Sequence, residues 1–379
     1  MLLLLLAACT GPHADDTAGP PIVDTSDPGA DNFPYDDAIH AFGLALDDAA
    51  LAALAADPYT SVHGTFTFQE ESYDVGVHLK GNYSFQDMSG KPSFKIDFHE
   101  WVPDQRFHDI ERFALNNMVQ DASMSSEHAS YHFYDTLGLV TPQHGYSQVS
   151  VNGEVYGLYG IVESVDEHFI NHHFDDDSGN LYEGGYGGDI AEGCDDKFEL
   201  KEAGEPADLS DMVTLIDSFL ATTPDTYFAY LSANFDVTPL LDLWAAELVA
   251  SNADAYTTLG NNFYLYHEPT TGLWTMIPTG PDQAFIGDVD VHEEHHGNLA
   301  LACVASAECN VQLDARIGNA VSVWSSSDLA GWVATETAKI EDACRTDPRS
   351  PWGDYGCRDA QAAMRDWTTA RPGVVQGEM

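Results

Sequence analysis

Three lysines lie close together in a strongly acidic chain. Lys80, Lys91 and Lys95 fall within sixteen residues and are half of the six lysines in the sequence. The 379 residues include 14 basic and 62 acidic side chains, which gives a formal charge of -48 at pH 7. An isolated group of ammonium ions can hold an anion such as phosphate. The alternative is that these lysines pair with local acids such as Asp97.

A carboxylate and two amides form a second candidate group. Asp254 follows an apolar segment that predicts a helix, and Asn261 and Asn262 open the next predicted strand. In phosphotransferases an Asp in such a loop accepts the hydroxyl proton, and a following Asn holds a metal ion. Asp282 comes just after a Gly-Pro turn at the end of another strand, a position that suits a magnesium ligand. The alternative is that these side chains only cap turns.

A third group has the letters of a zinc motif. His292, Glu293 and His296 match HExxH, which binds zinc only where the two histidines share one face of a helix. Asp288 and Asp290 precede the motif, and Gly and Asn follow it at once. We therefore predict a mobile acidic loop here, with a metal site as the alternative.

The composition argues against one class of partner, and the N-terminal residues indicate a cellular location. The acidity argues against nucleic acid as a partner, because phosphate backbones need clustered Lys and Arg. Residues 1–9 resemble the end of a bacterial lipoprotein signal with Cys9 as the lipidated residue, and residues 10–32 predict a flexible acidic, Pro- and Gly-rich tether. We expect an exported protein at the bacterial cell envelope or surface, which contacts membrane only through the lipid on Cys9.

The other five cysteines predict disulfides. Cys303 lies six residues before Cys309, and Cys344 lies thirteen before Cys357. In an exported protein each would pair with its neighbour and leave Cys194 free. A zinc site is the rival interpretation, but no CxxC spacing is present.

The pattern of apolar residues predicts an α+β fold. Alternating segments predict strands in the first half, with hairpins at Asn152-Gly153 and Thr271-Gly272, and Asp121 is a candidate N-cap for a helix that ends at Gly138. The last third predicts helices. We expect one continuous domain over residues 33–372, followed by a tail at 373–379.

These segments, in this order, resemble the spore coat protein H (CotH) kinase-like family over about Leu79 to Gly287. The pieces read LKGNYSF…KPSFKIDF, FALNNMVQDASM, LGLVTPQHGYSQVSVNGEVYGLYGIVESVDEHFI, GNLYEG, FELK, NADAYTTLGNNFYLY and IPTGPDQAF. The VNG…GLY…E…VDEHF run is the most specific of them. The HExxH letters lie outside the match.

The resemblance implies an atypical protein-kinase-like fold, strand-rich first and helical later. It implies that the chain binds ATP with Mg or Mn and phosphorylates Ser or Thr of a protein substrate. By position, Asp254 would be the catalytic Asp and a lysine among Lys80, Lys91 and Lys95 would contact the ATP phosphates. Glu163 would orient a lysine, by analogy with other kinases. The metal ligands would be Asn261 or Asn262 and Asp282.

The chain departs from the family pattern at three places. Lys80 replaces an Arg, Ser126 stands where an Arg is common, and Gly280 stands where a Trp-Asp-x-Asp run has its first Asp. Lys lacks the bidentate fork of Arg, and a lost carboxylate weakens a site for a hard cation. An alternative function is therefore a degenerate kinase scaffold that acts as a cell-surface binding or adhesion protein. Hydrolytic classes, a zinc protease or a glycan-active enzyme, are a third hypothesis.

Overall fold

The computed structural model describes residues 33–185, 187–204, 208–293 and 295–379. The chain divides into two units, Met1–Phe33 and Pro34–Met379, and everything below concerns the second. The predicted lipoprotein signal and the predicted tether lie outside the described residues. No helix of the described part is long and apolar enough to cross a membrane.

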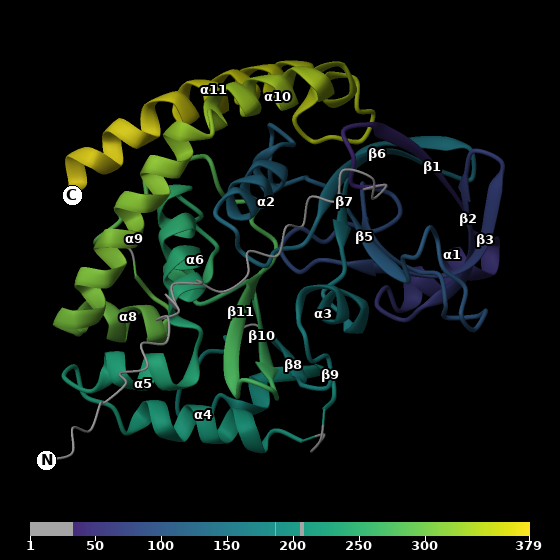
Figure 1. The fold of residues 1–379 in the computed structure, drawn as a ribbon. Coiled ribbons are helices and arrows are strands. Elements are labelled where there is room, and N and C mark those ends of the chain that lie inside the picture. The colour runs from purple at the N-terminus through teal and green to yellow at the C-terminus, as the bar shows by residue number, and fades with distance from the viewer. Residues whose placement is uncertain (1–32, 186, 205–207, 294) are drawn as a thin grey trace, which may run out of the picture. The chain divides into compact units, whose positions relative to one another are not determined.

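A closed seven-stranded barrel forms the first part of this unit (Figure 1). Its order is β1 (Ile39–Ala45), β2 (Val62–Phe68), β3 (Glu71–Lys80), β4 (Ser93–Asp97), β5 (Arg112–Asn116), β7 (Glu154–Glu163) and β6 (His144–Val151). β1 pairs with β6 in parallel and closes the barrel, while the other pairs are antiparallel. The helix α1 (Asp48–Ala56) connects β1 to β2.

Aromatic side chains fill the barrel. Phe66, Phe98 and Phe113 are fully buried, and the ring of Phe66 contacts both others edge-on or nearly so. Successive side chains of a strand point to opposite faces, so the residues between these apolar positions point outward. The outer face of β3, β4 and β5 therefore carries the polar side chains, among them Lys80 and Lys95.

A second sheet and a helical part complete the unit. The sheet has the order β11 (Leu273–Pro278), β10 (Phe263–Glu268), β8 (Asn180–Gly184) and β9 (Phe198–Glu202). The helices are α2 (Ser126–Thr136), α3 (Glu167–His173), α4 (Ser210–Leu220), α5 (Tyr227–Asn234), α6 (Val237–Val249), α7 (Tyr256–Leu259), α8 (Asn298–Ala305), α9 (Ala307–Ser326), α10 (Leu329–Arg345) and α11 (Gly353–Glu378), with a short 3₁₀ helix at Asp195–Lys197.

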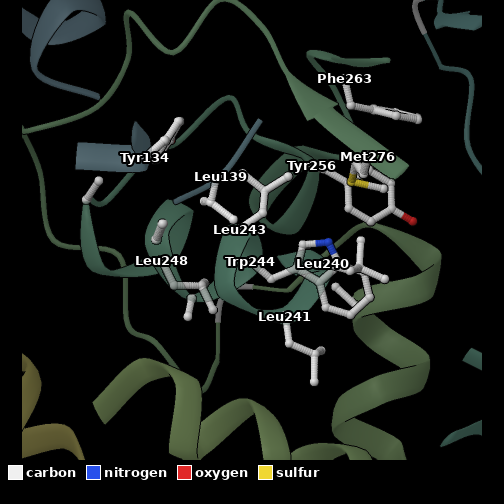
Figure 2. Packing of buried hydrophobic residues seen from close by; sticks show 14 of the residues in the cluster. Tyr134, Leu139, Leu240, Leu241, Leu243, Trp244, Leu248, Tyr256, Phe263 and Met276 are labelled. Carbon is white, nitrogen blue, oxygen red and sulfur yellow. The ribbon is translucent and has the colours of Figure 1, made fainter. Parts of the chain in front are cut away.

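The apolar helix α6 is the centre of the main hydrophobic cluster. Trp244 is fully buried and packs with Leu240, Leu243 and Tyr256, as Figure 2 shows. α6 contacts α2, α9 and the strand β11, so one helix links the second sheet to the helical part. α2 in turn contacts β6 of the barrel. This chain of contacts fixes the residues that follow α6 against the barrel.

The predicted α+β order of strands before helices is confirmed, as are the two hairpins and the two disulfides. Cys303 is bonded to Cys309 and Cys344 to Cys357, while Cys194 is the free cysteine in the described part of the chain. The turns at Gly153 and Gly272 have positive φ angles of 81° and 69°, which glycine adopts without strain.

Two predictions at helix ends are wrong. α2 begins five residues after Asp121, whose carboxylate accepts hydrogen bonds from the backbone N–H groups of Ser123 and Ser125 in the preceding turn and of Ser126, the first residue of the helix. The expected tail 373–379 instead continues α11, with Val375 fully buried. Pro372 has no N–H to bond the carbonyl of Thr368, and Trp324 Nε1 donates to that oxygen at 3.1 Å.

Candidate functional site

Lys80 is the best-placed lysine of the group that the sequence singled out. It ends β3, and its Nζ donates to Oδ1 of Asn116 at 2.8 Å. Asn116 ends β5, and its amide nitrogen donates to both carboxylate oxygens of Glu127, at 2.9 and 2.8 Å. An ammonium group can only donate and an ionised carboxylate can only accept, so the amide, which does both, bridges them. Glu127 thus orients Lys80 through Asn116.

The register of the barrel strands brings these side chains together. Lys80 is opposite Ser93, and Phe94 is opposite Leu115, so Asn116 lies one strand further on the same face as Lys80. Glu127 comes from the first turn of α2 and is only 3% exposed. Burial raises the pKa of its carboxyl, while the bonds from Asn116 and the charge of Lys80 lower it.

Lys95 lies on the same outer face, beside His78 of β3. The pKa of Lys95 is lowered, mainly by burial and then by the charges of Lys80 and Lys201. Lys201 extends from β9, with its Nζ 3.2 Å from Glu183 and 3.1 Å from Glu199. Three of the six lysines in this acidic chain therefore gather between the barrel face and the second sheet.

Asp254 and the two predicted asparagines form one hydrogen-bonded group. Asn261 Nδ2 donates to Asp254 Oδ1 at 3.1 Å, and Asn262 Nδ2 donates to Asp254 Oδ2 at 2.9 Å. Asn262 has a φ of 58°, a left-handed conformation that Asn tolerates better than most residues. The short helix α7 between them turns the chain back, so residues seven and eight positions apart meet.

Asp282 follows β11 and lies among other acids. Burial raises its pKa to about 7, and the carboxylates of Glu127, Asp121 and Asp254 add to this, while Lys80 opposes it. Asn262 Nδ2 also lies 3.4 Å from the carbonyl oxygen of Gly280. The structure therefore brings Asp254, Asn262 and Asp282 together, with Lys80 near enough to act on the charge of Asp282.

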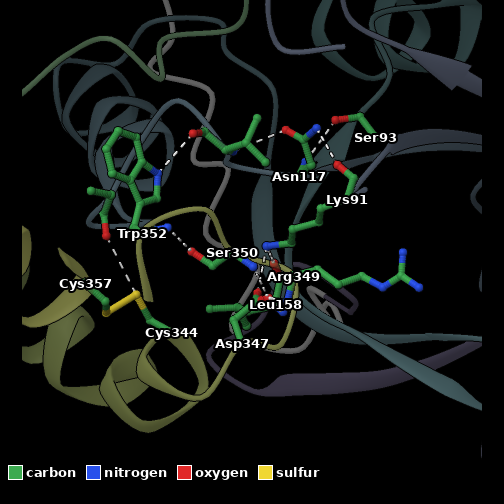
Figure 3. A network of polar contacts seen from close by, with 12 residues as sticks. Lys91, Ser93, Asn117, Leu158, Cys344, Asp347, Arg349, Ser350, Trp352 and Cys357 are labelled. Atoms are coloured by element: carbon green, nitrogen blue, oxygen red, sulfur yellow. Dashed lines mark hydrogen bonds and ion pairs between the residues drawn. A yellow bond between two sulfur atoms is a disulfide. The ribbon is translucent and has the colours of Figure 1, made fainter. Parts of the chain in front are cut away.

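Two of the predicted residues lie elsewhere. Lys91 is fully buried and forms an ion pair of 2.7 Å with Asp347, as Figure 3 shows, so it is not available to a nucleotide. Glu163 is opposite Phe113, whose ring fills the barrel, and its carboxylate accepts the backbone N–H of Gln143 at 3.0 Å. Glu163 thus faces away from Lys80 and Lys95, and Glu127 is the acid that orients a lysine.

Sequence reasoning missed Glu127, Asn116 and Lys201. Glu127 had a signal, since it shares the buried face of α2 with Tyr131 and Tyr134 at helical spacing, and an acid there needs a partner. Lys201 is the last letter of the FELK piece. Asn116 had no signal of its own, because only the strand register places it beside Lys80.

The residues present fit a divalent cation bound with phosphate. Asp254, Asp282 and the side-chain oxygens of Asn261 and Asn262 are the hard oxygen donors that Mg²⁺ and Mn²⁺ prefer. The pKa of Asp282 is raised first by burial and then by the carboxylates of Glu127, Asp121 and Asp254, whose negative charge a cation would offset. Within the described ranges no three His, Cys, Asp or Glu side chains gather as a metal site, so the amides are needed in the donor set.

The zinc motif does not form the helix that it requires. Among the described residues α8 begins only at Asn298, after the HExxH letters, and His292 instead lies 3.6 Å from Asp314. The expected loop is confirmed as a non-helical segment.

The fold and site define an α+β protein in which lysines on a barrel face meet a carboxylate–amide group held by a helical part. The model of the family described as CotH kinase protein matches residues 77–317, and the chain belongs to this family. The match contains Lys80, Glu127, Asp254 and Asp282 but ends before α10.

Two known proteins are similar to this chain, one in sequence and one in structure. The inner spore coat protein H of Bacillus subtilis (strain 168) is 25% identical over 233 residues, which is 58% of this chain and 61% of that protein. The chain thus spans about three fifths of the relative's length. The crystal structure of the Helicobacter pylori proinflammatory kinase CtkA is similar at a TM-score of 0.32 and 9% identity, over 79% of this chain and 95% of that one.

Proposed function

We propose that this protein binds ATP with Mg²⁺ or Mn²⁺ and transfers the terminal phosphate to Ser or Thr hydroxyls of a protein substrate. One observation carries the proposal: Asp254 is hydrogen-bonded to Asn262, and the charges of Asp254 and Lys80 both act on Asp282, so four residues from three separate segments lie near one another. Phosphoryl transfer needs this combination, with cations for the phosphates, hard oxygen ligands for a metal and a carboxylate for the hydroxyl.

The residues divide into three roles. Lys80 and Lys95, with Lys201, would hold the phosphates, and Glu127 orients Lys80 through Asn116. Asp282 and Asn262, or Asn261, would hold the metal ion, which when bound neutralises charge on the phosphates. Asp254 would accept the hydroxyl proton of the substrate. Each of its oxygens receives one bond from an asparagine and keeps a free lone pair for this task.

Gly280 supports a second candidate function. It stands where the family pattern has the first of two carboxylates, and glycine has no side chain that could bind a metal ion. A chain with one metal carboxylate fewer fits a scaffold that has lost nucleotide binding and acts as a surface adhesion protein. This alternative predicts no saturable binding of nucleotide.

Calorimetric titration separates the two functions. We would titrate the full chain with ATP, with and without Mn²⁺ or Mg²⁺, and repeat this with Asp282→Asn. The matched control is Asp314→Asn, which removes one carboxylate from the half-exposed surface of α9. Metal-dependent binding that is lost only in Asp282→Asn supports the kinase. Well-folded wild-type protein that binds no ATP supports the scaffold.

The proposed location is the cell envelope, with the chain anchored by lipid on Cys9. Two disulfides support export, because such bonds persist in oxidising compartments. Metabolic labelling with a fatty acid tests the anchor. Label on the wild-type chain that is absent from Cys9→Ser is the expected result, and unlabelled wild-type protein would contradict it.

A further inference from the structure

One buried and one partly buried histidine lie next to Glu127. His144 opens β6 and is 6% exposed, and His128 follows Glu127 on α2. Their Nδ1 atoms are 2.9 Å apart. Nε2 of His144 lies 3.8 Å from a carboxylate oxygen of Glu127, and Nε2 of His128 lies 3.4 Å from Glu336 on α10. Four side chains thus form a row from the candidate site to α10.

The backbone makes room for this row at Gly160. Gly160 is opposite Asn116 in the barrel, and a Cβ at this position would lie 2.6 Å from Nε2 of His144 and 3.7 Å from Glu127. Any other residue would push His144 away from Glu127. Nε2 of His144 is buried and has no hydrogen-bond partner among the described residues, so the carboxylate of Glu127 is its available partner.

The contact between the two rings couples their protonation. A hydrogen bond between two Nδ1 atoms requires that one ring donates and the other accepts. If neutral His128 donates, His144 carries its proton on Nε2 and presents an N–H to Glu127. If neutral His144 donates, it presents a lone pair to Glu127, and His128 presents its N–H to Glu336. The protonation state of Glu336 therefore influences whether His144 presents an N–H group or a lone pair to Glu127.

We propose that His144 and His128 are positioning residues that couple Glu127 to Glu336 of α10 and, through Asn116, fix Lys80. The part that concerns Lys80 rests on the proposed nucleotide function, whereas the coupling of Glu336 to Glu127 does not. Because α10 lies beyond residues 77–317, the device ties the family domain to the C-terminal helices of this chain.

Other charged groups also face the pair. Burial lowers the pKa of both histidines, and for His128 the carboxylate of Glu336 opposes this, so two neutral rings are consistent with the geometry. Lys339 of α10 forms an ion pair with Glu336 and lies 3.4 Å from Asp37. The remaining titratable neighbours are His132, Tyr131 and Tyr146.

Imidazole NMR tests the coupling without any nucleotide. The full chain would be labelled with ¹⁵N-histidine, and the ring nitrogens compared between wild type and Glu336→Gln. We expect the ring nitrogens of His144 to shift, although Glu336 contacts His128 and not His144. The control Glu341→Gln removes an exposed acid from the same helix and should leave both rings unchanged. A shift confined to His128 would overturn the coupling.

Titration with Mn²⁺-ATP tests the effect on the site. His144→Leu removes the imidazole beside Glu127 and should weaken binding about tenfold. His144→Gln keeps a donor and an acceptor and should bind within about threefold of wild type, with less dependence on pH. His172→Gln is the control, because it removes an exposed imidazole of α3 that is not part of the row.

The outcomes are distinct. Wild-type affinity in His144→Leu, or equal losses in the Leu and Gln variants, would overturn the positioning role. A wild-type chain that binds no ATP would overturn the proposed function and the role assigned to Lys80. The NMR comparison would still decide whether Glu336 and Glu127 are coupled, and it uses no substitution at His144 that could prevent folding.

Discussion

Lys91 and Asp347 form an ion pair of 2.7 Å in which neither side chain is exposed. The ammonium group also donates to the carbonyl oxygen of Leu158 at 2.7 Å, and the same carboxylate accepts the N–H of Leu158 at 2.9 Å (Figure 3). Gly157 permits this approach, since a Cβ there would lie 2.3 Å from the carboxylate. The pair joins the barrel to the connection between α10 and α11, and its role is structural.

Removal of one partner should therefore destabilise the fold. Lys91→Met leaves the carboxylate of Asp347 buried without its cation, which costs about 3–5 kcal/mol of unfolding free energy. Denaturant unfolding measures this loss. The control Arg358→Met breaks a pair with Asp359 that is about half-exposed on both sides, so we expect a change below about 1 kcal/mol. Similar small losses in both variants would contradict the structural role of Lys91.

In contrast to Lys91, Lys80 and Lys95 should affect nucleotide binding and have little effect on stability. Lys80→Met and Lys95→Met remove cations from the candidate phosphate site, and each should weaken Mn²⁺-ATP binding by about tenfold or more with little loss of stability. The exposed Lys197 is the control, since Lys197→Met removes the same charge outside this group. Unchanged affinity in both site variants would remove these lysines from the nucleotide site.

Glu247 should make stability depend on pH. It is buried on α6 and accepts hydrogen bonds from N and Oγ1 of Thr257, at 3.1 and 2.9 Å. Burial raises its pKa from 4.5 to about 7. Its contribution to the unfolding free energy is on the order of 3 kcal/mol. This contribution is fully present below pH 4.5 and is lost as the pH rises through 7.

Glu247→Gln isolates this contribution, because Gln is neutral at every pH and can still accept the bonds from Thr257. The difference in unfolding free energy between Glu247→Gln and wild type should grow in favour of the variant from pH 5 to pH 8. A difference that is the same at both pH values would show that the pKa of Glu247 is not raised.

Asp282 should link metal binding to proton release. Its pKa of about 7 means that much of it is protonated at neutral pH, whereas a metal ligand must be ionised. The affinity for Mn²⁺-ATP should rise from pH 6 to pH 8, and calorimetry in buffers of different ionisation enthalpy should detect the released proton. Binding that releases no proton at pH 6.5 would contradict the assignment of Asp282 as ligand.

Local patterns predicted the elements and part of the site. The alternation of apolar and polar residues predicted the strands, and the turn residues at Asn152 and Gly272 predicted the hairpins. Both signals act over a few neighbouring residues. The order of the family-like segments also placed Asp254, Asn262 and Asp282 in one group. The structure brings them together, although their chemical roles stay predictions.

Contacts between distant residues could not be predicted in the same way. Lys91 and Lys95 are four residues apart and look alike in sequence, but Asp347, which buries Lys91, lies in the last tenth of the chain. The resemblance predicts that Glu163 orients a lysine, yet its strand position turns it away from the outer face. Glu127 acts through Asn116, and only the barrel register reveals that relay.

The most direct test of the central claim is phosphate transfer by the wild-type chain and by Asp254→Asn. Each chain would be incubated with Mn²⁺, ATP labelled in the terminal phosphate, and dephosphorylated casein as acceptor. Mass spectrometry would then identify the phosphorylated residues on the casein and on the chain itself. We predict phosphoserine or phosphothreonine with the wild type, and none with Asp254→Asn although it still binds Mn²⁺-ATP. Equal transfer by both proteins, or saturable ATP binding by the wild type without any transfer, would contradict the account.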